Sequence, residues 1–290
     1  MRILLTGGLG QVGWELQRTL SALGTVVATD RRNLDLTDEK AIRQAVQTLR
    51  PEWVVNAAAY TAVDDAERDE PTATWMNAVV PRILAEEIER LNGWMVHYST
   101  DYVFDGLGTR PYREDDPTAP LSAYGRSKRA GELAVAATGV KHLLFRVAWI
   151  YGARGRNFLR TIRRLAREQD ELRVVADQVG VPTWSRQVAE ATALILAQQP
   201  TLNQAGTYHL AGDLACSWHM FAEAILGLDP DQGSLRAQSV RPVASVDFST
   251  PAHRPAYSVL DGSRAEAVFG VKLAPWKAQL ALCMAEPGLG

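Results

Sequence analysis

Short apolar runs alternate with longer segments of helical apolar spacing through the first 150 residues of the chain. This alternation is typical of βαβ units, in which helices connect parallel strands and cover the sheet. The runs Ile3-Leu4-Leu5 and Trp53-Val54-Val55 are apolar at every position, which indicates strands buried on both faces. We therefore predict an α/β fold, a Rossmann-type doubly wound parallel sheet with ligands at the carboxyl ends of its strands. The expected strands are residues 2–6, 25–29, 53–56, 94–99 and 142–147, and the expected helices are residues 11–23, 39–49, 72–91 and 122–138.

The pattern changes after about residue 150. Loops rich in Gly, Arg, Asp and Pro then separate shorter elements, which include expected helices at 185–198 and 217–226. We predict an NAD(P)-binding Rossmann domain over residues 1–150 and a smaller, mainly substrate-binding lobe over residues 151–290, some of whose segments return to the sheet. Residues 237–259 contain three prolines and little periodicity, so we expect an ordered loop there.

Composition excludes several classes of protein. The chain has 290 residues, 31 Lys and Arg against 33 Asp and Glu, and 47% hydrophobic residues. A chain of this length buries roughly 70–75% of its unfolded surface and folds without disulfides or a structural metal. The near-zero net charge argues against a nucleic-acid partner, and the hydrophobic content argues against disorder.

Nothing in the sequence indicates a membrane or secreted protein. The longest apolar stretch, residues 191–197, is far shorter than the roughly 20 residues of a membrane span. The first five residues are followed at once by Thr6-Gly7-Gly8, so no apolar signal segment is expected. Two cysteines, Cys216 and Cys283, are too few for a disulfide framework. We expect a cytoplasmic protein.

Glycines at positions 7, 10 and 13 lie between the first expected strand and the first expected helix. Without Cβ atoms such a turn is tight, and a pyrophosphate can approach the amide groups at the positive end of the helix. A glycine turn in any βα unit is the plain alternative. Because this loop has a strand before it and a helix after it, it predicts a dinucleotide site.

Asp30 ends the second expected strand, where a carboxylate can bind the hydroxyls of the adenosine ribose. Its alternative role is a turn cap. Arg31 and Arg32 follow and could neutralise a 2′-phosphate, so the choice between NADH and NADPH stays open. Asp35 and Leu36 precede the second helix, where the adenine needs an edge contact and an apolar wall.

Tyr124 and Lys128 are four residues apart at the start of an expected helix, so they project from one face. A nearby ammonium favours the charged form of a phenol, and we expect Lys128 to lower the pKa of Tyr124. A surface pair is the alternative for this spacing alone. Thr100, at the end of a preceding strand, supplies a hydroxyl at the same sheet edge.

These motifs together resemble the extended short-chain dehydrogenase/reductase superfamily, and within it the reductases that act on the 4-keto group of dTDP-4-dehydrorhamnose. The run Ser99-Thr100-Asp101-Tyr102-Val103-Phe104 is the most diagnostic. The resemblance covers nearly the whole chain and is carried by residues 10–16, 56–64, 97–104, 120–128, 146–152, 177–183, 206–210 and 250–255.

The resemblance implies that Thr100, Tyr124 and Lys128 form the reaction centre. It also implies that Thr100, Asp101 and Trp149 touch the sugar nucleotide. By its charge, Arg254 is a further candidate for the substrate diphosphate, with a loop salt bridge as the alternative. The expected cofactor-binding residues are Gly7, Gly10, Gln11, Val12, Gly13, Asp30, Arg31, Asp35, Leu36, Ala57, Ala59, Tyr60, Thr61, Tyr98, Tyr124 and Lys128.

The implied reaction moves a hydride from NADPH or NADH to the 4-keto carbon of dTDP-4-dehydro-β-L-rhamnose and yields dTDP-β-L-rhamnose. Some relatives are dimers joined by Mg²⁺ on carboxylates, which makes a homodimer and Mg²⁺ expectations here too. Where we look for one such carboxylate, the chain has Arg186 instead. This departure speaks against a metal-linked dimer, and we assign no metal ligand.

Two other functions fit the same scaffold. A sugar-nucleotide 4,6-dehydratase or 4-epimerase is the first, although dehydratases typically follow the threonine with Asp-Glu and here Tyr102 follows Asp101. A regulatory subunit that binds NADP without turnover is the second. Thr100, Tyr124 and Lys128 occur together, which favours the enzyme.

Overall fold

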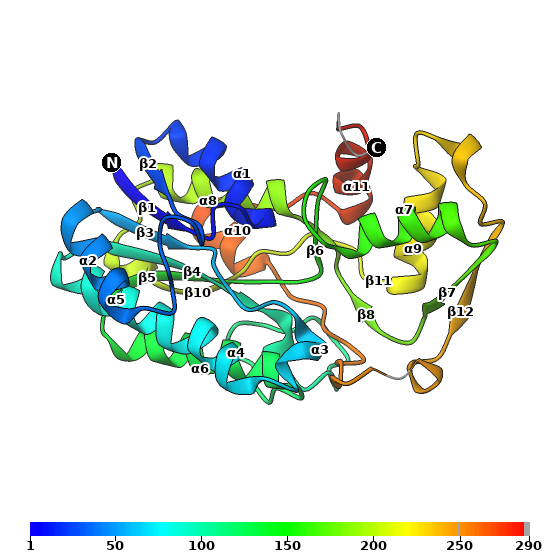
Figure 1. The fold of residues 1–290 in the computed structure, drawn as a ribbon, viewed down its shortest axis with the longest axis horizontal. Coiled ribbons are helices and arrows are strands. Elements are labelled where there is room, and N and C mark those ends of the chain that lie inside the picture. The colour runs from blue at the N-terminus through cyan, green and yellow to red at the C-terminus, as the bar shows by residue number, and fades with distance from the viewer. Residues whose placement is uncertain (249, 287–290) are drawn as a thin grey trace.

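The computed structural model of the protein describes residues 1–248 and 250–286, and a six-stranded parallel sheet lies at its centre (Figure 1). The strand order is β10-β5-β4-β3-β1-β2. The predicted parallel α/β sheet is confirmed, and its sixth strand, β10, comes from the second half of the chain. The six strands are β1 (Arg2–Thr6), β2 (Thr25–Ala28), β3 (Trp53–Asn56), β4 (Trp94–Thr100), β5 (Lys141–Val147) and β10 (Gly206–His209).

Helices cover both faces of this sheet (Figure 1). One face carries α1 (Gln11–Ser21), α8 (Ser185–Ala197) and α10 (Ser263–Phe269), and the other carries α2 (Glu39–Leu49), α5 (Val80–Arg90) and α6 (Ala123–Ala137). Successive side chains of a strand point to opposite faces. Ile3 and Leu5 therefore enter the core under α1 and α8, while Leu4 enters the core under α5. This two-sided burial is why the strand is apolar throughout.

The predicted single helix over residues 72–91 is wrong in its middle. The structure has α4 (Glu70–Thr74), a π-helical turn at Trp75–Val79, and then α5. Pro81 has no N–H to donate to the carbonyl of Asn77, four residues before it, so an α-helical bond cannot form at that step. Helix α6 approaches closely here, because a Cβ on Gly131 would lie 1.9 Å from the Asn77 carbonyl oxygen.

The second half of the chain builds a lobe with its own apolar core. Tyr151, Phe221 and Trp276 are fully buried in that core. Figure 1 shows this lobe beside the carboxyl ends of the central strands. Its elements are β6 (Ile150–Tyr151), α7 (Phe158–Glu168), β7 (Glu171–Val175), β8 (Val179–Gly180), β9 (Thr183–Trp184), β11 (Cys216–Ser217), α9 (Trp218–Gly227), β12 (Ser239–Val243) and α11 (Trp276–Met284).

The predicted loop over residues 237–259 is wrong at its start, because β12 forms there. It pairs in parallel with β7, with Pro242 opposite Val174. A proline is tolerated because this ladder has two strands, so one side of β12 needs no backbone donor. The rest of the segment contains a 3₁₀ turn at Ser245–Asp247, and residue 249 lies outside the described residues. Within the described residues no helix is long and apolar enough to span a membrane.

A buried ion pair links α7 to the segment that follows α9 in the second lobe. Arg163 Nε on α7 donates to Asp229 Oδ2 at 2.8 Å, and Arg167 Nη2 donates to Asp229 Oδ1 at 2.9 Å. Asp229 and Arg163 are both buried. Burial acts to raise the pKa of Asp229, but the hydrogen bonds from Arg163 and Arg167 outweigh it and lower the pKa to about 2.

We expect Asp229→Asn to lower the free energy of unfolding by about 3–5 kcal/mol at neutral pH, because it leaves the Arg163 guanidinium buried without its counter-charge. The folded pKa lies below the unfolded one, so the pair stabilises the protein above about pH 4 and loses its effect as the pH falls toward 2. Guanidinium denaturation at several pH values measures this. The exposed Asp170–Arg236 pair is the control, since Asp170→Asn should cost at most about 1 kcal/mol.

Candidate active site

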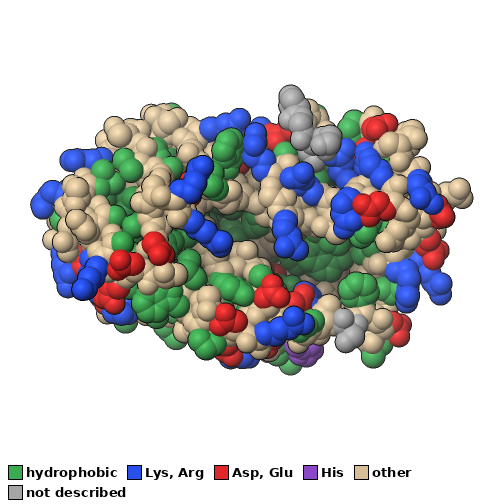
Figure 2. Space-filling model, viewed as in Figure 1, with side chains coloured by type: hydrophobic (Ala, Val, Ile, Leu, Met, Phe, Trp, Pro, Cys, Tyr) green, Lys and Arg blue, Asp and Glu red, His purple; other side chains and the backbone are tan. Residues whose placement is uncertain are grey.

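The loops that follow β1, β3 and β4 meet at the carboxyl edge of the sheet. The chain runs from β1 to β2 on one side and from β2 across to β3 on the other, so the strand order reverses beside β1. Ligands of open α/β sheets bind at such a reversal. Figure 2 shows the molecule hollowed between the sheet and the second lobe, with hydrophobic side chains inside the hollow, Lys and Arg side chains along its upper rim, and both acidic and basic side chains along its lower rim.

The glycine turn after β1 is closed by contacts that side chains would prevent. Gly7 has φ +73°, and a Cβ on it would lie 2.6 Å from the Ala58 nitrogen. A Cβ on Gly13 would lie 2.1 Å from the Gly7 carbonyl oxygen. Gly10 is the N-cap residue that precedes α1, and among the described residues no side chain caps this helix end. The first amide groups of α1 are therefore available to an anion, and the turn fits a dinucleotide pyrophosphate.

The acidic residues expected at the adenosine are both in hydrogen-bonded turns. Asp30 accepts from Arg32, whose side-chain hydrogen bond is the main reason that the pKa of Asp30 lies below its usual value. Asp35 accepts from the backbone N–H and the hydroxyl of Thr37 at 2.8 and 2.7 Å. The carbonyl of Leu36 accepts from Trp75 Nε1 at 2.9 Å. The turn-cap alternative is thus observed, while binding of adenosine by Asp30, Arg31, Asp35 and Leu36 stays a prediction.

Asn77 positions the loop after β3, a role that no sequence motif described above predicts. Tyr60 N donates to Asn77 Oδ1 at 2.8 Å, and Asn77 Nδ2 donates to the Tyr60 carbonyl and to Ser127 Oγ at 3.0 and 2.9 Å. The fully buried amide thereby joins the loop of residues 57–61 to α6. An asparagine four residues before Pro81 inside a helical pattern was the available signal for this irregular turn.

Thr100, Tyr124 and Lys128 come together at this edge. Ser122 caps α6 by accepting from Gly125 N at 3.1 Å, which puts Tyr124 in the first turn. Thr100 ends β4 and lies close enough to Tyr124 to affect its pKa. Lys128 is buried, and its Nζ donates to the Tyr98 carbonyl at 2.5 Å. A hydroxyl, a phenol and an amine therefore lie at the same carboxyl edge of the sheet as the glycine turn, an arrangement that can protonate a carbonyl oxygen.

The pKa of Tyr124 moves opposite to our expectation. Burial raises it to about 12, the nearby Thr100 side chain opposes that rise only in part, and the charge of Asp101 adds to it. Burial also lowers the pKa of Lys128 to about 8. The expectation that the Lys128 ammonium lowers the pKa of Tyr124 is therefore wrong in the protein alone, because loss of water dominates the shift and Lys128 is not among its causes. The phenol keeps its proton at neutral pH.

The side chains of Tyr98 and Trp149 make contacts that their expected roles do not include. The Tyr98 hydroxyl pairs with Thr192 at 2.7 Å inside the core, so the carbonyl is the part of Tyr98 that contacts Lys128. Trp149 has φ +48°, and its indole stacks on Trp218 with centroids 3.4 Å apart. One face of the indole is thus already covered. The backbone of Gly180 also packs against it, since a Cβ there would lie 2.4 Å from the ring.

The proposed substrate residues Asp101 and Arg254 lie near Tyr102. Burial raises the pKa of Asp101 to about 7, although Thr100 donates to its Oδ1 at 3.0 Å. Arg254 forms two hydrogen bonds to Asp64, of 3.0 and 2.8 Å. The salt-bridge alternative for Arg254 is therefore observed, and its binding of a diphosphate stays a prediction.

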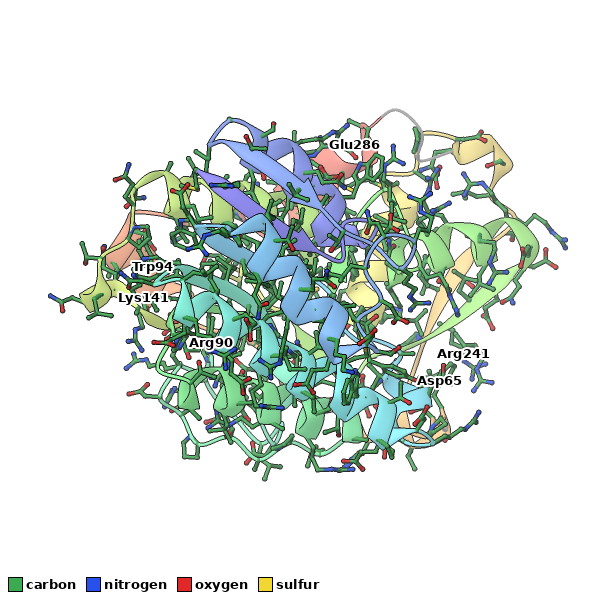
Figure 3. All side chains as sticks on the ribbon, turned by 60° about the vertical axis from the view of Figure 1, so that its left-hand side comes forward. Asp65, Arg90, Trp94, Lys141, Arg241 and Glu286 are labelled. Carbon is green, nitrogen blue, oxygen red and sulfur yellow. The ribbon has the colours of Figure 1, made fainter. Side chains whose placement is uncertain are left out.

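The residues around Arg186 do not fit a divalent cation. Its guanidinium pairs with Glu15 at 3.1 Å and with Glu286, which Figure 3 shows at the end of α11 beside α1. Glu190 lies close enough for Arg186 to affect its pKa, which burial raises. A positive side chain thus occupies the middle of this carboxylate group. Within the described residues no three His, Cys, Asp or Glu side chains gather so as to hold a metal.

The doubly wound sheet, the glycine turn and the Thr100, Tyr124 and Lys128 group define an NAD(P)-dependent oxidoreductase of the extended short-chain dehydrogenase/reductase type. Comparison with known proteins narrows this class. The family model described as the RmlD substrate binding domain matches residues 1–288. The chain belongs to this family.

Several proteins that are similar to the chain over nearly its whole length are named dTDP-4-dehydrorhamnose reductase. It is 46% identical to a dTDP-4-dehydrorhamnose reductase of Burkholderia thailandensis over 292 residues, covering 98% of each chain. A dTDP-4-dehydrorhamnose reductase structure from Clostridium acetobutylicum superposes with a TM-score of 0.91 at 37% identity, covering 98% of each chain. The Bacillus anthracis protein of that name, solved in complex with NADP, gives a TM-score of 0.89 at 32% identity and covers 99% of each chain.

The raised pKa of Asp101 predicts that the stability of the fold depends on pH. Its folded pKa of about 7 lies above the unfolded value, so the extra proton stabilises the fold fully below about pH 4 and ceases to do so as the pH rises through 7. We therefore expect Asp101→Asn to become more stable relative to wild type between those values. Chemical denaturation of both proteins across this range measures the difference, and parallel pH profiles would contradict a proton held at Asp101.

Proposed function

We propose that the protein is an NAD(P)H-dependent reductase that converts dTDP-4-dehydro-β-L-rhamnose into dTDP-β-L-rhamnose. The observation that carries this proposal is that Thr100, Tyr124 and Lys128 gather at the same carboxyl edge of the sheet as the glycine turn, in a chain 46% identical to a named dTDP-4-dehydrorhamnose reductase. The bound nicotinamide supplies the hydride for C4 of the sugar.

The protein residues handle the proton and the developing charge. Tyr124, whose raised pKa keeps its hydroxyl protonated, gives that proton to the 4-keto oxygen. The Thr100 hydroxyl, which donates to Asp101 Oδ1 in the protein alone, turns its one proton to the same oxygen when the substrate is bound and stabilises the negative charge that develops there. Lys128, anchored on the Tyr98 carbonyl, holds the nicotinamide ribose and favours loss of the phenolic proton once the ligands are in place.

Tyr102 favours a reductase over a dehydratase. Its ring meets that of Tyr124 edge to face with centroids 5.9 Å apart, at the chain position where dehydratases typically have a glutamate. Burial raises the pKa of Tyr102 well above its usual value, so this phenol is no base near neutrality. The second acid-base group that water elimination requires is thus replaced by a neutral ring.

We extend the proposal to the rest of the site and to the protein as a whole. Residues 1–150 mainly bind the cofactor and residues 151–290 mainly bind the sugar nucleotide, with Asp101, Trp149 and Arg254 at the substrate. We also propose a homodimer and a cytoplasmic location. Both cysteines are buried free thiols, which suits a reducing compartment.

The direct test offers purified protein dTDP-4-dehydrorhamnose with NADH and NADPH in turn. We expect one reduced cofactor to be consumed per sugar converted, and NMR to identify dTDP-β-L-rhamnose as the product. A sugar that changes without net cofactor oxidation would indicate an epimerase or dehydratase. Tight cofactor binding without any oxidation would indicate a regulatory subunit.

We expect Tyr124→Phe to bind NADPH as wild type does and to reduce the ketosugar roughly 10²–10⁴-fold more slowly, because a positioned acid contributes a factor of that size. Stopped-flow measurement of NADPH oxidation gives the rate, and fluorescence titration gives the binding constant. Wild-type turnover by this variant would remove Tyr124 from the proposed mechanism.

A further inference from the structure

A loop of the second lobe lies against the first turn of α1. This bridging loop, residues 152–157, connects β6 to α7. Gly155 has φ +72°, and a Cβ on it would lie 3.1 Å from Gln11 Cγ. Gly152 is also close, with its Cβ position 3.9 Å from Gln11 Oε1. The guanidinium of Arg154 lies 4.2 Å from the centre of the Trp14 ring, one turn further along α1.

Asn157 joins the two halves of the chain through one side chain. Its Oδ1 accepts from Arg160 N at 3.1 Å and so caps α7. Its Nδ2 lies 2.9 Å from Gln11 Oε1 and 2.9 and 3.0 Å from the carbonyl oxygens of Gly152 and Arg154, so its two protons are shared among these three acceptors. The Asn157 amide therefore stabilises the bridging loop, caps α7 of the second lobe and hydrogen-bonds to the first residue of α1.

The hydrogen bond from Asn157 to Gln11 bears on the cofactor site because of where Gln11 lies. Gln11 is the first residue of the helix whose uncapped amide end fits a pyrophosphate. A glutamine side chain at a helix start has many rotamers, and some of them cover the neighbouring amide groups. The bond to Asn157 selects one that turns the side chain into the bridging loop. The amide end of α1 is then preorganised for an anion before binding.

We propose that Asn157 is a positioning residue of the dinucleotide site, acting from the second lobe through Gln11. Asn157 does not touch the cofactor in this role. Because coupling between two sites is reciprocal, a bound cofactor in turn strengthens the attachment of α7 to α1. The proposal rests on the proposed function only for the use of a nicotinamide dinucleotide, so it is tested with NADPH alone.

The test is a double-mutant cycle on NADPH affinity. Asn157→Ser keeps a hydroxyl that caps α7 but removes the donor to Gln11, and Gln11→Met keeps the side-chain length but removes the acceptor. We expect each variant to raise the Kd for NADPH by about 3- to 10-fold, the effect of one hydrogen bond, and the double variant to be no weaker than either single one. Fluorescence titration measures all four proteins.

A control separates positioning from general destabilisation. Ser217 caps α9 in the same lobe by accepting from Met220 N at 3.1 Å. Ser217→Ala should lower the melting temperature and leave the Kd for NADPH unchanged. In steady-state assays Asn157→Ser should raise KM for NADPH more than it lowers kcat at saturating cofactor. Asn157→Thr, which also retains a capping hydroxyl, replaces the serine variant if the latter does not fold.

Two results would overturn the proposal. One is an unchanged NADPH affinity in a folded Asn157 variant. The other is a double variant whose loss of affinity equals the product of the two single losses, since the two side chains would then act independently. If NADPH binds as expected but the ketosugar is not reduced, the proposed function fails while the role of Asn157 stands.

Discussion

The contact between Gly13 and the Gly7 carbonyl is the constraint on which the rest of the site depends. A Cβ at Gly13 would come within 2.1 Å of that oxygen, so only glycine lets α1 start so close to the end of β1. Helix α1 then presents its amide end at the sheet edge and its apolar side to the core. Helix α8 from the second half packs on α1, and Thr19 Oγ1 donates to the Ala189 carbonyl at 3.1 Å. Moving α1 outward would disturb all of these contacts.

Two amide side chains, the buried Asn77 and the half-buried Asn157, connect the elements around this turn. Asn77 joins the loop after β3 to α6, and Asn157 joins α7 to α1. In both cases one short side chain satisfies backbone groups that irregular structure leaves unpaired. A buried polar group without such partners is costly, so the fully buried Asn77 admits few alternatives at its position. These residues hold the site in shape without a chemical role in the reaction.

Burial also explains the electrostatic state of the reaction centre. Tyr124, Lys128 and Asp101 all have pKa values moved toward their neutral forms, to about 12, 8 and 7. Removal from water disfavours charge of either sign, and here it outweighs the attraction between neighbours. At Arg186 the balance is opposite, because the hydrogen bond from Arg186 to Glu15 and the nearby negative charges outweigh burial and raise the pKa of Arg186.

The sequence by itself determined the parallel sheet, because strands apolar at every position need burial on two faces and cannot form a one-sided sheet. It also determined the glycine turn and the placement of Tyr124 and Lys128 on one face of a helix, since both follow from local spacing. Only the tertiary structure decided that Pro81 permits a π turn, that Pro242 lies in an edge strand, and that Tyr98 faces the core. It also decided the pKa of Tyr124 and the grip of Asn157 on Gln11, 146 residues apart. The physical reason is that desolvation and long-range hydrogen bonds depend on which distant segments come into contact. A local sequence pattern contains no information about these contacts.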